Sequence, residues 1–297
     1  MTDIYRDLRY LRVPVEDLDG AEAFATGIFG LQPGDHDDAN RRFRSDARNY
    51  AICYTAEAGP AAVALTVAHA RELDEAEARL EAACPGLPRQ RLDAAACAAR
   101  QIKAGLSVIA PNGVVVEIVW RPLTSGWRYH GSRDAGITGL QSVQIACTDP
   151  AANEDFWTRG IGAEVSDWAG DAVFLRIDDA HHRIALYPSD RDGLLGAVWE
   201  VDGINAVMQG WYLFQARQVP VVHGPGRQPT SGAMFVTARG PGGLLHSYAH
   251  GMERGAAVTG RGPRQFADAA LSHCAWGSPC TAPEFLGKDE FLGRDER

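Results

Sequence analysis

The sequence contains two copies of one pattern, and this repeat limits the fold more than any other feature. Residues 9–17 align without a gap with residues 141–149, and the correspondence continues through the helix-forming stretch that follows. The two copies also end alike, because a Pro-x-Gly turn precedes a short apolar strand at residues 111–118 and again at 241–248. Each copy spans about half of the chain, which is the size of an ordinary domain. We therefore expect two tandem domains with the same fold.

Each copy divides again into smaller units of a strand, a helix and further strands. In the first half, residues 61–67 alternate as a strand does, and residues 71–83 carry apolar side chains at the helical period. Residues 196–201 and 204–218 are their counterparts in the second half. The sequence thus predicts an α+β fold in which each half is a pair of βαβββ modules.

Changes in composition mark the domain boundaries. Residues 123–136 are rich in Gly, Ser and Arg and show no periodicity, so we expect a linker there. This places an N-terminal domain at residues 1–122 and a C-terminal domain at residues 137–252. Residues 253–297 have little apolar periodicity and are expected to form a C-terminal tail.

Charge and hydropathy exclude several classes of partner. The formal net charge is -9 and no Lys/Arg cluster stands out, so we expect no nucleic-acid partner. No apolar run is long enough to span a bilayer, and the first residues lack the apolar region of a signal peptide. We therefore expect no membrane association and a cytoplasmic location, where the six scattered cysteines would be free thiols. Association into a homo-oligomer is left open.

The tandem modules and two short motifs resemble the vicinal oxygen chelate superfamily, which includes glyoxalases, bleomycin resistance proteins and dioxygenases. Residues 181–186, His-His-Arg-Ile-Ala-Leu, resemble the family's His-His-x-x-Ala strand, and residues 275–277, Ala-Trp-Gly, resemble the Trp-Gly near its C-terminus. Within the superfamily the chain looks most like the two-domain type I extradiol ring-cleavage dioxygenases. The resemblance implies open, barrel-like mixed sheets, a non-catalytic N-terminal domain and a pocket in the C-terminal domain.

Members of that family hold Fe(II) with two histidines and one glutamate, a facial triad that leaves metal positions open for a diol and O2. Carried over by position, the three ligands fall on Ser142, Gly196 and Ser247, none of which is a good ligand for Fe(II). The family's active-site tyrosine falls on Thr237, and a further histidine falls on Gln228. We therefore expect no metal and no cofactor, and a pocket that is larger and uncharged.

Two features of the family's site remain, and they suggest proton chemistry on an aromatic ligand. His182 matches an acid/base histidine, and its ordinary pKa near neutrality suits a general base. Phe174 matches an aromatic side chain that packs on the substrate ring. On the same strand, the neighbouring His181 is expected to face out. The alternative is that His182 is a strand histidine that only hydrogen-bonds to the backbone.

Other residues are expected to bind the ligand. Gln144 shares a strand face with Ser142 and could hydrogen-bond a phenol or carbonyl oxygen. Val198 is placed on the neighbouring strand, and Thr230 closes the Gly/Pro loop at the pocket's edge. The predicted substrate-binding residues are Ser142, Gln144, Phe174, Gly196, Val198, Gln228, Thr230, Thr237 and Ser247.

Three functions remain open from the sequence. The first is a metal-independent enzyme of isomerase, lyase or hydrolase type that acts on an aromatic, phenolic or polycyclic molecule through His182. The second is an Fe(II) extradiol dioxygenase with non-standard ligands, for which a rebuilt site could draw on His182, His246, His250 and Glu200. The third is a non-catalytic binding or resistance protein. Glu117, which stands in the first half where the second half has Ser247, is expected to be structural.

Overall fold

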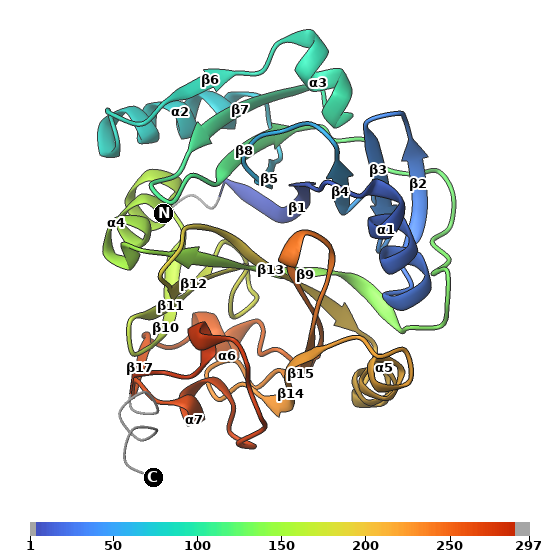
Figure 1. Cartoon of the computed structure of the whole chain (residues 1–297). Coiled ribbons are helices and arrows are strands. Elements are labelled where there is room, and N and C mark those ends of the chain that lie inside the picture. Colours follow the sequence, from blue (N-terminus) through green and yellow to red (C-terminus); the bar gives the residue numbers. More distant parts are fainter. Residues whose placement is uncertain (1–3, 289–297) are drawn as a thin grey trace.

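The computed structural model describes residues 4–288, which fold into two open mixed sheets, one from each half of the chain (Figure 1). The elements of the first half are β1 (Tyr5–Pro14), α1 (Leu18–Ala23), η1 (Phe24–Ile28), β2 (Gln32–His36), β3 (Asn40–Arg44), β4 (Ile52–Thr55), β5 (Ala62–Val67), α2 (Arg71–Ala83), β6 (Arg89–Arg91), α3 (Ala94–Arg100), β7 (Ala104–Ile109) and β8 (Val115–Trp120). Those of the second half are β9 (Ile137–Cys147), α4 (Pro150–Asp155), η2 (Phe156–Ile161), β10 (Glu164–Ala169), β11 (Ala172–Arg176), β12 (Ile184–Pro188), β13 (Gly193–Val201), α5 (Ile204–Ala216), β14 (Val221–Arg227), β15 (Met234–Arg239), η3 (Pro241–Gly243) and β16 (Leu245–His250). The tail adds α6 (Ala256–Thr259), β17 (Arg264–Phe266), α7 (Ala270–His273) and η4 (Pro283–Phe285).

The two sheets share one connectivity. The first has the strand order β2-β3-β4-β1-β5-β8-β7-β6, and the second has the order β14-β15-β16-β13-β9-β12-β11-β10-β17. Strand β1 pairs in parallel with β4 and antiparallel with β5, which pairs in parallel with β8. Strands β9, β12, β13 and β16 repeat these pairings in the second sheet. The α+β fold of paired βαβββ modules in open mixed sheets is confirmed.

The repeated residues make the same local structure in each half. Asp17 and Asp149 are N-caps, whose carboxylates accept hydrogen bonds from the backbone N–H of Gly20 at 2.9 Å and Ala152 at 3.0 Å. Each capped α-helix continues into a π-helical turn, η1 or η2, that begins at a phenylalanine. The gap-free alignment of residues 9–17 with 141–149 therefore reflects one strand-turn-helix unit built twice.

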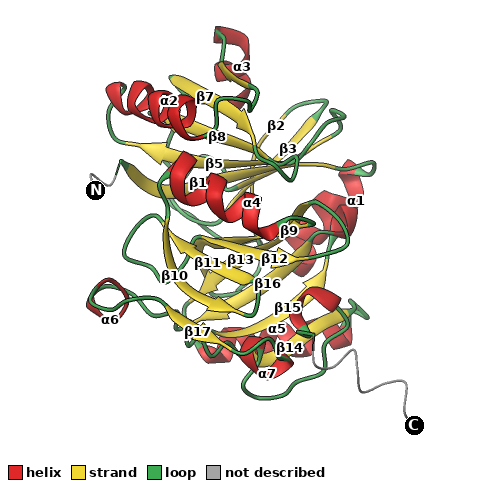
Figure 2. Ribbon diagram, turned by 90° about the vertical axis from the view of Figure 1, so that its left-hand side faces the viewer, coloured by secondary structure: helices red, strands yellow, loops and turns green. Residues whose placement is uncertain are grey.

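The two sheets stack against each other through a shared apolar core. The largest buried cluster draws residues from both halves, and Figure 2 shows helix α4 lying between the two sheets. Two tyrosines bond across the contact: Tyr5 Oη donates to the carbonyl of Ile161 at 3.0 Å, and Tyr248 Oη donates to that of Phe29 at 2.6 Å. The first half thus supports one face of the second sheet, and the opposite face carries the candidate active site.

The expected tail is part of the second sheet. Strand β17 pairs in parallel with the edge strand β10, so that Arg264 lies opposite Asp167. Helix α7 and the 3-10 turn η4 then return over the sheet, where backbone N–H groups of Thr281 and Ala275 donate to Val222 and Arg227. Residues 289–297 of the expected tail, like residues 1–3, lie outside the described residues.

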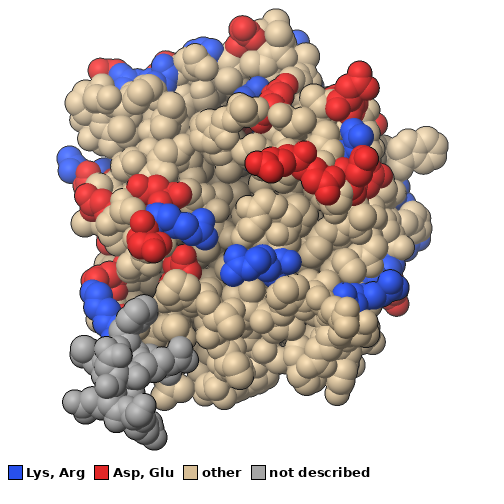
Figure 3. Space-filling model, in the orientation of Figure 1, with Lys and Arg blue, Asp and Glu red and all other residues tan. Residues whose placement is uncertain are grey.

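On the face shown in Figure 3, lysines and arginines are interspersed with aspartates and glutamates outside the grey atoms. The lower part of this face is largely uncharged. None of the helices in residues 4–288 is both long enough and apolar enough to cross a bilayer.

Candidate active site

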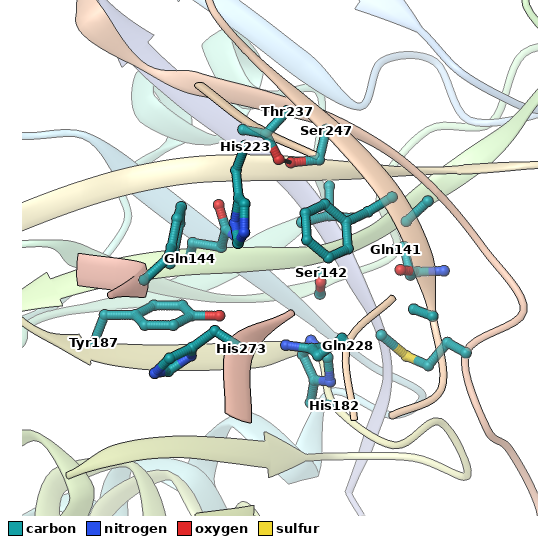
Figure 4. A pocket seen from close by; sticks show the side chains of 16 residues that line it. Gln141, Ser142, Gln144, His182, Tyr187, His223, Gln228, Thr237, Ser247 and His273 are labelled. Carbon is teal, nitrogen blue, oxygen red and sulfur yellow. Dashed lines mark hydrogen bonds between the residues drawn. The ribbon is translucent and has the colours of Figure 1, made fainter. Parts of the chain in front are cut away.

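A cavity of about 40 Å³ lies against the second sheet, between the sheet and the tail. Figure 4 shows polar side chains from several strands and from the tail turned toward it. Its lining residues are Gln141, Ser142, Gln144, His182, Tyr187, Val198, His223, Gln228, Ala233, Phe235, Thr237, Ser247, Ala249, Met252, His273 and Phe285. The lining contains histidines, amides and hydroxyls but no carboxylate.

Most of the predicted site residues meet at this cavity. His182, Ser142, Gln144, Val198, Gln228, Thr237 and Ser247 all line it. Phe174 does not; it is fully buried behind His182, with the two rings edge to face at 5.1 Å between centroids. Thr230 is also fully buried, and its carbonyl accepts a hydrogen bond from Arg264. Gly196 is the third predicted residue outside the lining.

The strand register explains the position of Gly196. Ser142, Val198 and Ser247 lie directly opposite one another across β9, β13 and β16. Gly196 lies two residues away along β13, opposite Gln144, whose Oε1 would be 2.5 Å from a Cβ added at the glycine. The register that places Gly196 between the two serines is therefore wrong, and Val198 occupies that place.

Bulges in the strand pair cause the shift. The pairing of β9 with β13 is irregular between Val198 and Trp199 and again between Glu200 and Val201, so that β9 carries two extra residues. One of them is Gln141, which a regular strand would turn to the face opposite Ser142. Both side chains instead line the cavity. Counting alternate residues back from Glu200 cannot reveal such an insertion.

The three opposed residues do not fit an iron site. Ser247 Oγ and Thr237 Oγ1 are hydrogen-bonded to each other at 2.7 Å, Val198 is apolar, and Ser142 offers only a hydroxyl. Within residues 4–288 no three His, Cys, Asp or Glu side chains are grouped so that they could hold a metal ion. The rebuilt site considered above does not form either: His246 faces the first half, His250 bonds to the carbonyl of Val201, and Glu200 pairs with Arg254.

The two consecutive histidines lie in the loop before β12, and their side chains contact each other. His181 Nδ1 is 3.0 Å from His182 Nδ1, and His181 Nε2 is 2.8 Å from Asp167 Oδ2. His181 is fully buried, so the expectation that it faces out is wrong. The loop lets both rings turn inward, whereas a strand would send neighbouring side chains to opposite faces.

Asp167 is the end of this chain of hydrogen bonds and is fully buried. Besides His181, it accepts hydrogen bonds from the guanidinium groups of Arg261 and Arg264. Burial alone would raise the pKa of Asp167, but the hydrogen bonds from His181, Arg264 and Arg261 outweigh it and hold the pKa well below its usual range. The carboxylate is therefore ionised.

His182 is neutral at physiological pH. Burial lowers its pKa well below the ordinary value for histidine, and the positive charge of Arg183 lowers it further. Its Nδ1 is engaged by His181, and no side chain or backbone group of residues 4–288 bonds to Nε2, which is left to meet a ligand. The backbone-bonded alternative for His182 finds no support, because the partner of its ring is another side chain.

Several polar atoms around the cavity have no protein partner. They are both amide atoms of Gln141, Oγ of Ser142, Oε1 of Gln144 and Nδ1 of His273. Burial raises the pKa of Tyr187 well above the ordinary value, and the neighbouring side chains of Gln144 and Gln228 only partly offset it. Burial likewise lowers the pKa of His223 and of His273 to about 4, so both are neutral. The cavity thus offers many uncharged donors and acceptors to a polar ligand.

The cavity is smaller than expected. Tyr187, Phe285 and the histidines fill the space that the small residues Ser142 and Ser247 leave. Its 40 Å³ compares with about 150 Å³ for an apolar cavity that binds benzene, so an aromatic ring fits only after side chains move. A second, open cavity of about 600 Å³ adjoins it, because His273 lines both.

In the first half, side chains fill the place that corresponds to the cavity of the second half. Glu117 is fully buried, accepts a hydrogen bond from Tyr10 Oη at 2.6 Å and pairs with Arg100 Nε at 2.6 Å. Its cross-strand neighbour is Ala64, the counterpart of Val198. A buried carboxylate satisfied by two partners is consistent with the structural role expected for Glu117.

Four polar side chains of the cavity were not predicted from the sequence: Gln141, Tyr187, His223 and His273. Gln141 and Tyr187 belong to strands that the repeat identifies, but the bulge and the twist that aim them inward leave no signal in the sequence. His273 and Phe285 come from the tail, whose path over the sheet no periodicity shows.

Comparison with known proteins agrees with this fold. Residues 139–247 match the family model "Glyoxalase/Bleomycin resistance protein/Dioxygenase superfamily". No curated protein matches the sequence significantly. Among solved structures, BphC, a halotolerant catechol dioxygenase, has a TM-score of 0.84 with 19% identity over 96% of this chain and 97% of its own.

Two further structures show the range of relatives. The Mn(II)-bound glyoxalase from Novosphingobium aromaticivorans has a TM-score of 0.82 and 22% identity, over 96% of this chain and 95% of that one. The 2,2',3-trihydroxybiphenyl 1,2-dioxygenase from Sphingomonas wittichii strain RW1 has a TM-score of 0.79 and 18% identity, over 93% of this chain and 100% of that one. At these identities the likeness establishes the fold alone. The chain therefore has the fold of these dioxygenase and glyoxalase structures, and its residues 139–247 match the model of the glyoxalase/bleomycin resistance protein/dioxygenase superfamily.

Proposed function

We propose that the C-terminal half binds a small hydroxylated aromatic molecule and acts on it by proton transfer to His182, without a metal-dependent step. The observation that carries the proposal is the buried chain Asp167–His181–His182, which ends in a cavity of uncharged polar groups. A neutral imidazole held by a second side chain, with one nitrogen free, has the arrangement of a general base. This makes the protein an enzyme of isomerase, lyase or hydrolase type.

The ligand class is supported by the walls of the site and by the relatives. Tyr187, Phe235 and Phe285 supply aromatic surface, while both amide atoms of Gln141 and the amide oxygen of Gln144 have no partner among the described protein atoms. Such a site suits a flat molecule that carries hydroxyl or carbonyl groups. Catechols and trihydroxybiphenyl, the compounds in the names of the structural neighbours, belong to that class.

In the proposed reaction, the residues of this chain divide binding and proton transfer between them. His182 Nε2 takes a proton from a hydroxyl or an acidic C–H of the bound molecule. The negative charge that develops is stabilised by donors at the cavity wall, the amide of Gln141 and the hydroxyl of Tyr187. His181 and Asp167 then stabilise the positive charge that His182 acquires.

Entry of the molecule requires the wall to open. Helix α7 carries His273, which separates the inner cavity of about 40 Å³ from the outer cavity of about 600 Å³. The outer cavity is large enough for a substituted aromatic ring. We propose that the ligand passes through it and displaces His273.

The proposal is tested by a ligand screen on protein treated with a chelator. Thermal shift against catechols, naphthalenediols and larger polyphenols identifies a ligand, and product analysis shows whether it is converted. Conversion by the wild type and by His130→Gln, a substitution of an exposed linker histidine, but not by His182→Gln supports the enzyme. Binding without conversion by any of the three proteins would favour a binding or resistance protein instead.

A further inference from the structure

Asp167 joins the tail to the histidine pair. Its Oδ1 accepts a hydrogen bond from Arg261 Nη1 at 2.8 Å and from the backbone N–H of Arg264 at 2.8 Å. Its Oδ2 accepts from Arg264 Nη2 at 2.6 Å and lies 2.8 Å from His181 Nε2. One carboxylate therefore holds two residues of the tail and one residue of the loop before β12.

The charges around Asp167 balance without a charge on His181. Arg261 and Arg264 carry two positive charges, while Asp167 and Glu253, which is 3.9 Å from both guanidinium groups, carry two negative charges. No surplus negative charge is left to stabilise an imidazolium at His181. We assign His181 the neutral form from this balance.

The hydrogen bonds then determine where each proton lies. Neutral His181 donates from Nε2 to Asp167, so its Nδ1 is an acceptor. His182 must donate to it from Nδ1, which leaves Nε2 of His182 with a lone pair toward the cavity side. This is the form that a general base requires.

We infer that Arg261 and Arg264 are positioning residues, which keep the proton of His182 on Nδ1 only while the tail is docked. When both arginines leave, Asp167 stays buried and has only His181 as a partner. A buried carboxylate left unpaired is costly, so His181 takes up one proton from solvent. Its new Nδ1–H donates to His182 Nδ1, and the proton of His182 moves to Nε2.

The dependence of the His182 tautomer on the tail matters because the same tail closes the cavity. Beyond β17, this segment supplies His273 and Phe285 to the cavity wall. The side chains of Arg264 and Arg261 are 40% and 23% exposed, whereas that of Asp167 is 0% exposed, so the arginines can move to solvent and the carboxylate cannot. His182 therefore has the unprotonated Nε2 that a base requires only when the tail closes the cavity. This inference rests on the role proposed for His182.

Nitrogen-15 NMR of histidine-labelled protein at pH 7 reads the tautomer directly, without a substrate. His182→Gln identifies the His182 signals by their loss. We expect a protonated Nδ1 and an unprotonated Nε2 in the wild type, and the reverse in Arg261→Gln/Arg264→Gln. Arg254→Gln is the matched control, because it removes a tail ion pair, with Glu200, that does not touch Asp167. It should leave the His182 signals unchanged.

A second, conservative variant shows whether a changed tautomer results from misfolding. Arg264→Lys keeps the charge and should keep the wild-type tautomer, whereas Arg264→Gln alone should show a mixture of both forms. A protonated Nε2 in the wild type, or an unchanged tautomer in a folded double variant, overturns the inference. If the double variant shows the swapped tautomer but the wild type converts no ligand, the tail still controls the tautomer of His182, and the role of His182 as a base is refuted. Once a substrate is known, the double variant should lose about 10²- to 10³-fold in kcat.

Discussion

Trp199 donates its indole Nε1–H to Nδ1 of His246 at 3.1 Å, where the two halves of the chain meet. On the other side of the imidazole, Nε2 lies 3.0 Å from the hydroxyl of Tyr54 in the first half. Since Nδ1 is an acceptor, Nε2 carries the proton and donates to Tyr54. His246 is thus a neutral histidine of the contact between the halves, on the strand face opposite Ser247, and burial lowers its pKa to about 3.

This neutral state makes the stability of the fold depend on pH. An unfolded chain binds a proton at His246 near pH 6.5, whereas the folded chain resists it down to about pH 3. The stabilising effect is therefore present above pH 6.5 and is lost progressively as the pH falls toward 3. His246→Gln should flatten the pH dependence of the unfolding free energy by about 1.4 kcal/mol per pH unit, measured by urea denaturation between pH 6 and pH 4.

Tyr54→Phe is the matched control for this measurement. It removes the partner of His246 Nε2 and should cost about 1–3 kcal/mol at pH 7, because a buried donor is left unpaired. It leaves the imidazole buried, so the pH dependence should match that of the wild type. An unchanged pH dependence in His246→Gln would show that His246 does not stay neutral in the folded chain.

The two serines of the cavity should differ in their contribution to stability. Ser142 Oγ has no partner among the described protein atoms, whereas Ser247 Oγ shares a hydrogen bond of 2.7 Å with Thr237. Ser142→Ala should change the unfolding free energy by less than about 0.5 kcal/mol, while Ser247→Ala should lower it by about 1–2 kcal/mol. Urea denaturation at pH 7 compares them, and equal losses would contradict the hydrogen-bond assignment.

The register across the three strands can be tested by building a metal site. The combination Ser142→His, Val198→His and Ser247→Glu places two imidazoles and a carboxylate on directly opposed residues, whose Cβ atoms lie about 5 Å apart. Such a triad suits a divalent metal. We expect close to one equivalent of zinc after dialysis, measured by elemental analysis on protein that circular dichroism shows to be folded.

The control for that experiment uses the other register. Replacing Val198→His by Gly196→His puts the second imidazole two residues away along β13, where the side chain of Gln144 already lies. This variant should retain little metal. Equal metal content in the two variants would mean that the pairing of β9 with β13 differs from the one described.

Much of the fold could be predicted because repeated residues perform the same local task twice. Asp17 and Asp149 cap equivalent helices, and the two Pro-x-Gly turns precede β8 and β16, the strands that bear Glu117 and Ser247. Alternation of apolar and polar residues then places Ser142 and Ser247 on one side of the sheet. These are short-range features, and the sequence shows them directly.

The parts of the site that could not be predicted depend on irregular or distant structure. The bulges at Thr138 and Gln141 add two residues to β9 without changing its apolar pattern, and so shift the register by two residues. His181 turns inward because it lies in a loop and finds Asp167, 14 residues earlier in the chain. His273 reaches the cavity from the tail, which is positioned by β17 and by the ion pairs of Arg261 and Arg264 with Asp167.

If His182 acts as a base in a site that uses no metal, turnover should depend on this residue and not on a metal ion. Turnover of the ligand found by the screen is measured for the wild type before and after chelation, and for His182→Ala. We expect that chelation leaves kcat unchanged, that His182→Ala lowers kcat by about 10²- to 10⁴-fold, and that the ligand still binds. Activity that chelation abolishes and Fe(II) restores, or a fully active His182→Ala, would contradict it.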